Sequence, residues 1–120
     1  MREIKFRGKR IDNNEWSYGY LFKIWERVYI LLGTTNGIPN MVEVDPKTVG
    51  QSITLPDKSG VEIYENDVMK NPKNNVIVYI SFKDGMFGFT RNMDNAFTFI
   101  DESDRWEIIG NTSDNPELIK

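Results

Sequence analysis

Turn-forming residues recur in this chain at intervals too short for helices. Between Asp45 and Met69 the sequence reads DPKTVGQSITLPDKSGVEIYENDVM. Pro, Gly, Asn and Asp punctuate this stretch, and each of them favours a turn for its own backbone reason. The apolar segments between the turns, such as Ser52–Leu55 and Glu62–Tyr64, are three or four residues long. Segments of this length suit β-strands rather than helices, so the stretch predicts a series of short strands.

Alternation of apolar and polar residues extends the β pattern to both ends of the chain. Ile4 and Phe6 fall on one face of the opening segment, as in a half-buried strand. Aromatic residues alternate at 16, 18, 20 and 22, after the turn residues at 12–14, so the first two strands are predicted to form a hairpin. Further strands are predicted at 27–32, 41–44, 52–55, 62–64, 67–70, 76–82, 86–90 and 106–109.

The remaining segments are predicted as turns, one loop and short helical turns. The polar stretch 33–40 is predicted to be a mobile loop. Asp45-Pro46 suits a helix start, but Gly50 limits any helix there to about one turn. Another helical turn is predicted at 115–117, and Asp94–Phe99 suits either a short helix or a strand. Lys83-Asp84-Gly85 is predicted to be a hairpin turn.

The sum of these elements is an all-β domain, either a barrel or a sandwich. From Gly60 onward the order of strands and turns is that of a small SH3-like barrel, which would occupy the C-terminal two-thirds behind the N-terminal hairpin. At 120 residues the chain is predicted to form one domain over 1–120. The expected core lies on the apolar side of the strongest strands, at Phe6, Trp16, Val78, Ile80, Phe82 and Ile108.

The chain resembles the YopX family of small phage and prophage proteins. The resemblance rests on the stretch from Asp45 to Met69, on the opening MREIKFR and on the closing WEIIGNTSDNPELI. It extends from Met1 to about Ile119. It implies a phage or prophage origin and a common portion folded as an SH3-type barrel.

Cysteine and histidine are absent from the sequence. Their absence excludes disulfides, thiolate or imidazole zinc sites and the usual base of a serine nucleophile. Two acidic groups remain: Asp101-Glu102-Asp104, whose spacing matches no calcium loop, and Glu62, Glu65 and Asp67, where Asp67 is expected to accept backbone N–H bonds. We therefore expect a protein that is not an enzyme and has no metal and no cofactor.

The charge distribution gives one candidate site. The net charge is −3, yet residues 1–30 hold seven Lys or Arg against four acids, which is +3 and leaves −6 for the rest. A basic, alternating strand could contact a nucleic-acid backbone. Equally, its cations could be the solvated face of an edge strand, where they discourage aggregation. The candidate contacts are Lys5, Arg7, Lys9 and Arg10.

The alternating aromatic residues of the second strand suit a core more often than a binding surface, although Tyr and Trp also dominate protein interfaces. Exposed strand edges favour self-association or strand addition. We expect a binding module whose partner is a second copy or a phage or host protein, with nucleic acid as the alternative. The longest apolar run, Val28–Leu32, is too short for a membrane helix, so we expect no membrane partner and a place in the cytoplasm of the bacterial host.

Overall fold

The computed structural model describes residues 4–119. The chain divides into two compact units, Met1–Ser52 and Ile53–Lys120, and each is described by itself. The regular elements of the described residues are antiparallel β-strands and three short 3₁₀ helices. The all-β prediction is therefore confirmed, and no helix in this part of the chain is long and apolar enough to cross a membrane. The extent of a single domain over 1–120 stays a prediction.

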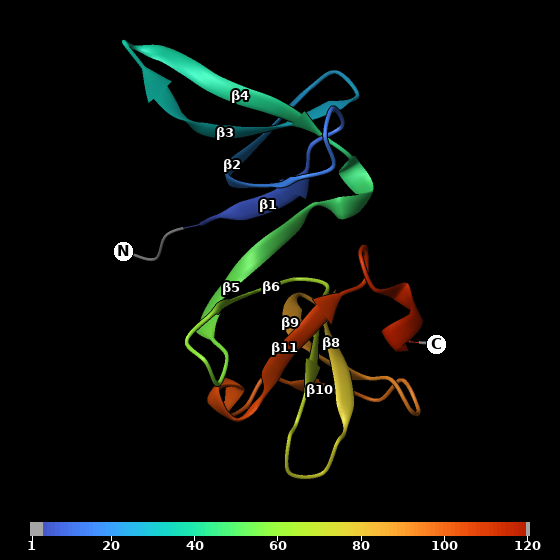
Figure 1. The fold of residues 1–120 in the computed structure, drawn as a ribbon. Helices are drawn as coiled ribbons and strands as arrows, with labels where there is room; N and C mark the ends of the chain where they lie inside the picture. Colours follow the sequence, from blue (N-terminus) through green and yellow to red (C-terminus); the bar gives the residue numbers. More distant parts are fainter. Residues whose placement is uncertain (1–3, 120) are drawn as a thin grey trace. The chain divides into compact units, whose positions relative to one another are not determined.

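The N-terminal unit is an antiparallel sheet with the order β4-β3-β2-β1-β5 (Figure 1). The predicted hairpin of the first two strands is confirmed, with Arg7 opposite Tyr18 and Lys9 opposite Trp16. The second hairpin, β2–β3, turns at Trp25-Glu26, with Ile24 opposite Arg27. The strands are β1 (Phe6–Lys9), β2 (Trp16–Ile24), β3 (Arg27–Thr35), β4 (Ile38–Val44) and the first residues of β5 (Gly50–Pro56).

The segment 33–40 is a hairpin rather than the expected loop. Strand β3 continues to Thr35 and β4 begins at Ile38, with a two-residue turn at Asn36-Gly37 between them. Both turn residues have positive φ, 51° and 76°. Asn-Gly adopts this left-handed pair with little strain, and its twist matches that of the flanking strands. The loop prediction was wrong because the polar composition of the segment concealed a strong hairpin signal.

Strand β1 is hydrogen-bonded on both of its edges. One edge pairs with β2, and the other pairs with β5 through Phe6 and Arg7. Beyond Arg7 this edge is hydrogen-bonded to the segment that follows β4. The Asp45 N–H donates to the Lys9 carbonyl over 2.8 Å, and the Lys9 N–H donates to Thr48 Oγ1 over 2.8 Å. The sheet therefore curls back on itself at this end.

The predicted helical turn near Asp45–Gly50 is confirmed as η1 (Pro46–Thr48). Asp45 caps it by accepting a hydrogen bond from the Lys47 N–H over 3.0 Å. Close packing beside this turn requires glycine at position 8, because a Cβ there would lie 2.8 Å from Val44 Cγ2. Val44 and Ile30 are fully buried and form the centre of the small N-terminal core.

The C-terminal unit contains a sheet with the order β10-β9-β8-β7-β11, and β6 (Glu62–Tyr64) pairs with β5. The predicted turn at Asp84-Gly85 joins β8 and β9, with φ of 54° and 81°. The sheet strands are β7 (Asp67–Lys70), β8 (Ile77–Lys83), β9 (Met86–Arg91), β10 (Phe97–Phe99) and β11 (Glu107–Asn111), and the short helices are η2 (Ser103–Arg105) and η3 (Pro116–Ile119).

The predicted elements of this unit are confirmed in part. The strand alternative for Asp94–Phe99 is confirmed by β10, and the terminal helical turn by η3. Helix η2 was not predicted. Across residues 4–119 the strand pairings do not close into a barrel, so the sheets are open where a barrel was expected. The SH3-like character of this unit stays a prediction.

The core of the C-terminal unit is one apolar cluster. Val78 and Ile80, both expected there, are buried, whereas Phe6, Trp16 and Ile108 are half-buried in their respective units. The cluster consists of Ile53, Ile63, Met69, Val78, Ile80 and Phe89.

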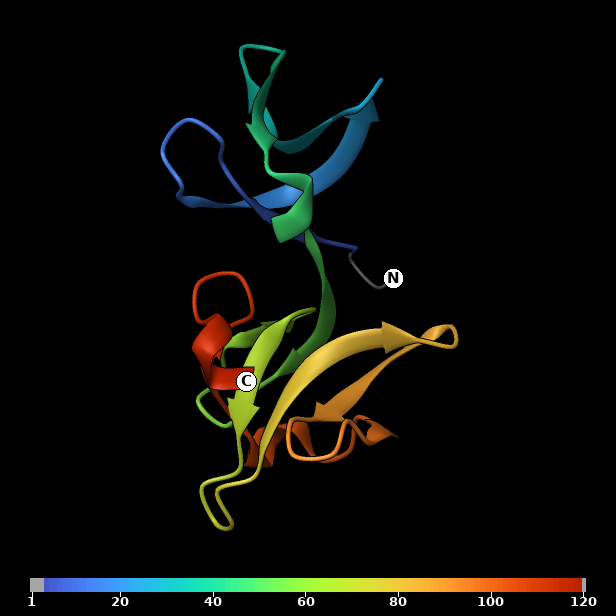
Figure 2. The same ribbon diagram turned by 90° about the vertical axis from the view of Figure 1, so that its right-hand side faces the viewer.

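Phe82 was expected in this core and is 55% exposed. It has the inward alternation of Val78 and Ile80, but it lies next to the β8–β9 turn. Figure 2 shows this hairpin, in yellow and orange, reaching well away from the other strands of its unit. Phe82 therefore contacts chiefly its cross-strand neighbour Phe87, edge to face at 4.9 Å between ring centroids. Alternation predicts the face of a strand but does not show where the core beneath that strand ends.

Two buried carboxylates organise the turns of this unit. Asp67 accepts a hydrogen bond from the Tyr64 N–H over 2.8 Å, as predicted. Asp57 accepts three: from the Ser59 and Val61 N–H groups over 2.8 and 2.9 Å, and from the Ile108 N–H over 3.1 Å. The last of these ties the 57–61 turn to β11, which is 51 residues away in sequence.

We predict that Ile80→Ala destabilises the protein by about 2–5 kcal/mol, because it removes fully buried methyl groups and leaves a cavity. Phe82→Ala serves as the matched variant on the same strand and should cost less than about 1 kcal/mol, because its ring is mostly hydrated already. Urea denaturation measures both free energies of unfolding. A larger loss for Phe82→Ala would contradict the placement of the core.

We predict that Asp57→Ala lowers the free energy of unfolding by at least about 2 kcal/mol. Three backbone N–H groups would lose a charged acceptor, and hydrogen bonds to charged groups contribute about 1.5–3 kcal/mol each without being additive. Asp101→Ala, an exposed acid in the same unit, is the control and should have little effect. Equal denaturation midpoints for the two variants would show that the Asp57 hydrogen bonds are dispensable.

Candidate binding surfaces

The four candidate basic residues do not form one continuous surface. Arg7 and Lys9 project from the same face of β1, while Arg10 follows on the opposite face, where its backbone forms an isolated bridge with Val44. Lys5, half-buried, precedes the strand, and its carbonyl accepts a hydrogen bond from the Ser52 N–H. Sequence alternation thus grouped Arg7 with Lys9 correctly, but the structure separates Arg10 from them.

Arg10 is bound to a neighbouring acid. Its Nε and Nη2 donate to the two carboxylate oxygens of Asp12 over 3.0 and 2.8 Å. This hydrogen bonding holds the pKa of Asp12 below its ordinary value and raises that of Arg10. The pair therefore stays ionised at neutral pH, and part of the Arg10 guanidinium is already occupied by a carboxylate.

Arg7 and Lys9 both lie against Trp16. The Arg7 guanidinium carbon is 4.6 Å from the centre of the Trp16 ring, and Lys9 Nζ is 5.8 Å from it. Both distances fall within the range of cation–π attraction. Arg7 itself is only 7% exposed. The expectation of a solvated basic strand therefore fits Lys9 better than Arg7.

The aromatic row of β2 lies on the outer face of the N-terminal sheet, not in its core. Ile30 and Val44 are buried on the other face, whereas Tyr18 and Tyr20 are exposed, Tyr20 by 57%. Cross-strand partners share a face, so Tyr29, opposite Phe22, belongs to the same surface, and the two rings stack at 5.4 Å. We call Trp16, Tyr18, Tyr20, Phe22 and Tyr29 the aromatic face.

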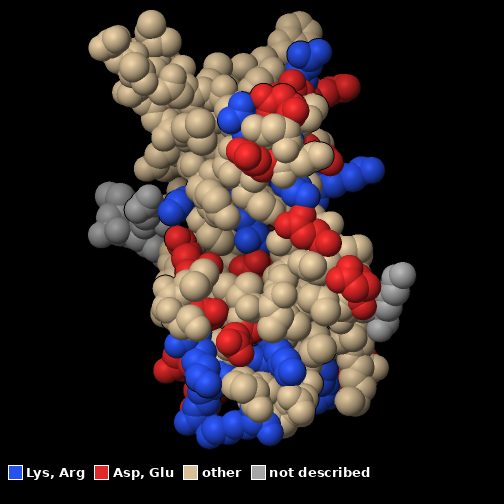
Figure 3. Space-filling view, in the orientation of Figure 1, with Lys and Arg blue, Asp and Glu red and all other residues tan. Residues whose placement is uncertain are grey.

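The β3–β4 hairpin carries no charged residue from Leu31 to Val42. Leu32, Ile38 and Met41 on this hairpin are all exposed, Ile38 by 67%. Figure 3 shows its outer end, at the upper left, as a surface without acidic or basic side chains. We call residues 31–42 the uncharged arm. The sequence contains this signal, because the arm lies within a run of 15 uncharged residues between Arg27 and Glu43, but the segment was predicted to be a loop.

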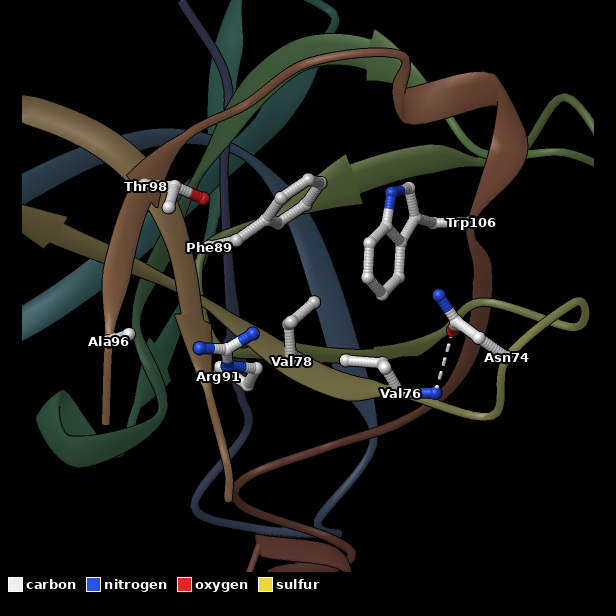
Figure 4. Close-up of a pocket in the computed structure, with 8 residues that line it drawn as sticks. All are labelled: Asn74, Val76, Val78, Phe89, Arg91, Ala96, Thr98 and Trp106. Atoms are coloured by element: carbon white, nitrogen blue, oxygen red, sulfur yellow. Dashed lines mark hydrogen bonds between the residues drawn. The ribbon is translucent and has the colours of Figure 1, made fainter. Parts of the chain in front are cut away.

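A hollow in the C-terminal unit is the second candidate site (Figure 4). It has a volume of about 240 Å³ and lies over one end of the apolar core. The Phe89 and Trp106 rings face it, with centroids 4.9 Å apart and planes tilted by 43°. We call it the Trp106 pocket. Its lining residues are Asn74, Val76, Val78, Phe89, Arg91, Ala96, Thr98 and Trp106.

Arg91 is the cationic group of the Trp106 pocket. Its Nε and Nη2 donate to Asp94 over 2.9 and 2.7 Å, and this bond lowers the pKa of the Asp94 carboxyl. A guanidinium carries five N–H donors, so three remain for another acceptor. Sequence reasoning missed this site, because its walls come from four separated segments that only the fold brings together.

The acidic groups of the sequence have partners within the C-terminal unit. Glu102 forms an ion pair with Arg105 at 3.1 Å, and Asp67 is occupied by the Tyr64 N–H. Within residues 4–119 no three acidic side chains are grouped so that they could hold a metal ion.

Comparison with known proteins gives a family and a fold. A search of curated proteins found no match. Among solved structures, the chain is similar to protein EF1440 from Enterococcus faecalis, with a TM-score of 0.58 and 21% identity over 100% of both chains. At this level of identity the similarity concerns the fold alone. The sequence model of the YopX protein family matches residues 5–120. The chain therefore belongs to the YopX family.

Proposed function

We propose that this protein is a non-enzymatic, phage- or prophage-encoded module that binds another protein in the cytoplasm of a bacterial cell. The observation that carries the proposal is the uncharged arm, whose exposed apolar residues lie on a hairpin with no charge over 31–42. Exposed apolar side chains concentrated on one hairpin favour an interaction site in a soluble protein. The absence of His and Cys from the sequence supports a role without acid–base or thiol chemistry.

The side chains of the arm, more than its backbone, are suited to contact the partner. Strand β4 lies at the edge of its sheet, and Pro39 within it lacks an N–H group. Proline on an edge strand hinders the addition of a further strand. Met41 and Tyr20 are both cross-strand partners of Leu31 and share one face of the sheet, whereas Ile38 lies on the other face of β4. The arm would then contact the partner with both of its faces, and Tyr20 would be an aromatic anchor of the type that dominates interfaces.

We predict that Ile38→Glu abolishes capture of the protein partner. Ile38 is the most exposed apolar residue at the tip of the arm, and a carboxylate in its place would be desolvated by the partner without a counter-charge. The measurement is a pull-down from lysogenic or infected cells, with and without nuclease. Phe99→Glu, which places the same charge at an exposed apolar position of the C-terminal unit, is the control and should retain the partner.

Loss of the captured protein on nuclease treatment would contradict this proposal and favour nucleic acid. So would equal capture by the Ile38→Glu and wild-type proteins, because the arm would then not be the contact surface.

One observation favours nucleic acid as the second candidate. Lys9 lies beside Trp16 on the same face of the sheet as the exposed Tyr18 and Tyr20. Single-stranded nucleic acids bind surfaces that combine cations for phosphate with aromatic rings for base stacking. The few cations available would support only weak, non-specific binding, with dissociation constants of about 10⁻⁴–10⁻⁶ M.

We predict that, if a single-stranded oligonucleotide binds, Tyr20→Ala weakens it by about 5- to 150-fold, the equivalent of ~1–3 kcal/mol for one stacked base. Lys9→Glu should weaken it further and reduce the dependence on salt, because fewer counterions are released. Fluorescence anisotropy of labelled DNA and RNA at about 50 mM salt measures this, with Lys83→Glu as the control. No binding by the wild-type protein would eliminate this candidate.

A further inference from the structure

Trp25 occupies the tip of the β2–β3 hairpin in an unusual state. Its φ is +59°, and its side chain is 90% exposed. Positive φ at a hairpin turn is normally adopted by Gly, Asn or Asp, and a bulky residue there is a genuine outlier. Leaving an indole in water also forgoes the large gain from burying it. Both features oppose stability of the isolated fold, and strain of this kind concentrates at functional positions.

The Trp106 pocket has the dimensions of a site for one side chain. Its volume of about 240 Å³ is below the ~300–1,000 Å³ typical of sites for drug-sized ligands. Two aromatic rings and the apolar groups of Val76, Val78 and Ala96 form its walls. A flat apolar group can contact aromatic walls in the offset or edge-on arrangements that rings prefer. An aromatic side chain is therefore the ligand that suits this pocket.

The charge around the pocket further restricts the kind of ligand that it can bind. Arg91 keeps three N–H donors for an additional acceptor, because only two of its five are bonded to Asp94. A carboxylate adjacent to the inserted ring could bind there. Trp25 is followed directly by Glu26, which is exposed on the same two-residue turn.

We propose that Trp25 of a second copy of this chain inserts into the Trp106 pocket, with its Glu26 facing Arg91. The two surfaces are different, so the contact is head-to-tail: each copy offers one hairpin tip and one pocket. Such heterologous contacts build rings or open chains of subunits. This inference goes beyond the proposed function, because it uses neither the uncharged arm nor the aromatic face.

The test separates the two halves of the contact. Trp25→Asn removes the indole and places at the positive-φ position a residue that tolerates it. Ala96→Leu fills the pocket from its wall, and Thr98→Phe does the same from the edge strand β10, should Ala96→Leu fail to fold. Circular dichroism confirms folding of each variant, and sedimentation velocity measures mass over a wide range of concentration.

Wild-type protein is expected to form species of two or more copies at high concentration, whereas each single variant stays at the monomer mass of 14.0 kDa. Mixing Trp25→Asn with Ala96→Leu leaves one intact tip and one intact pocket. The mixture should therefore form a dimer of twice 14.0 kDa and nothing larger. Ile38→Glu, on the arm, is the control and should associate like the wild type.

Four results would overturn the proposal. Wild-type protein that stays monomeric at all concentrations would show that the contact does not form between copies. Single variants that associate like the wild type would place the interface elsewhere. A mixture that remains monomeric, although the wild type associates, would show that tip and pocket do not bind each other. Loss of association in Ile38→Glu alone would assign self-association to the arm instead.

Discussion

The two-residue period of β-strands determines what each surface of this protein can do. Strand β2 carries its aromatic residues on one face, and the core of the N-terminal unit lies on the other. Ile30 and Val44 occupy the buried face, and the cross-strand registers place Tyr18, Tyr20 and Phe22 on the other. A small unit cannot cover both faces of its own sheet. The exposed aromatic residues therefore follow from the limited size of the core.

The same limit explains how much of the structure the sequence could predict. Val78 and Ile80 were found correctly because β8 alternates over a core that is present beneath them. Phe82 continues the same alternation past the edge of that core. Its local sequence pattern is the same as that of Val78 and Ile80, so the pattern alone could not show that it is exposed. Likewise, Asn36-Gly37 is a typical hairpin turn, but the polar residues around it led to the prediction of a loop. Local patterns report strand, face and turn, whereas the extent of burial depends on contacts that are distant in sequence.

The candidate sites also differ in how far each could be predicted from the sequence. Arg7 and Lys9 could be grouped from alternation alone, but the cation–π contacts of both with Trp16 depend on the register of β1 with β2. The Trp106 pocket could not be predicted from the sequence. Its residues, among them Asn74, Phe89 and Trp106, come together only when the five strands from β7 through β11 pair in one sheet. The uncharged arm was readable from the sequence once its hairpin was recognised.

Strand edges and hairpin tips in this protein differ in how they can contact another chain. Pro39 lies on the edge strand β4, where it hinders the backbone pairing that leads to uncontrolled aggregation. The hairpin tips have no such restriction, because a two-residue turn presents side chains rather than a row of unpaired N–H and C=O groups. Exposed apolar residues at these positions, Ile38 next to one turn and Trp25 within another, can therefore make side-chain contacts of defined geometry. Contact through a side chain at such a tip adds no strand to the sheet, so association there leaves the pairing of its strands unchanged.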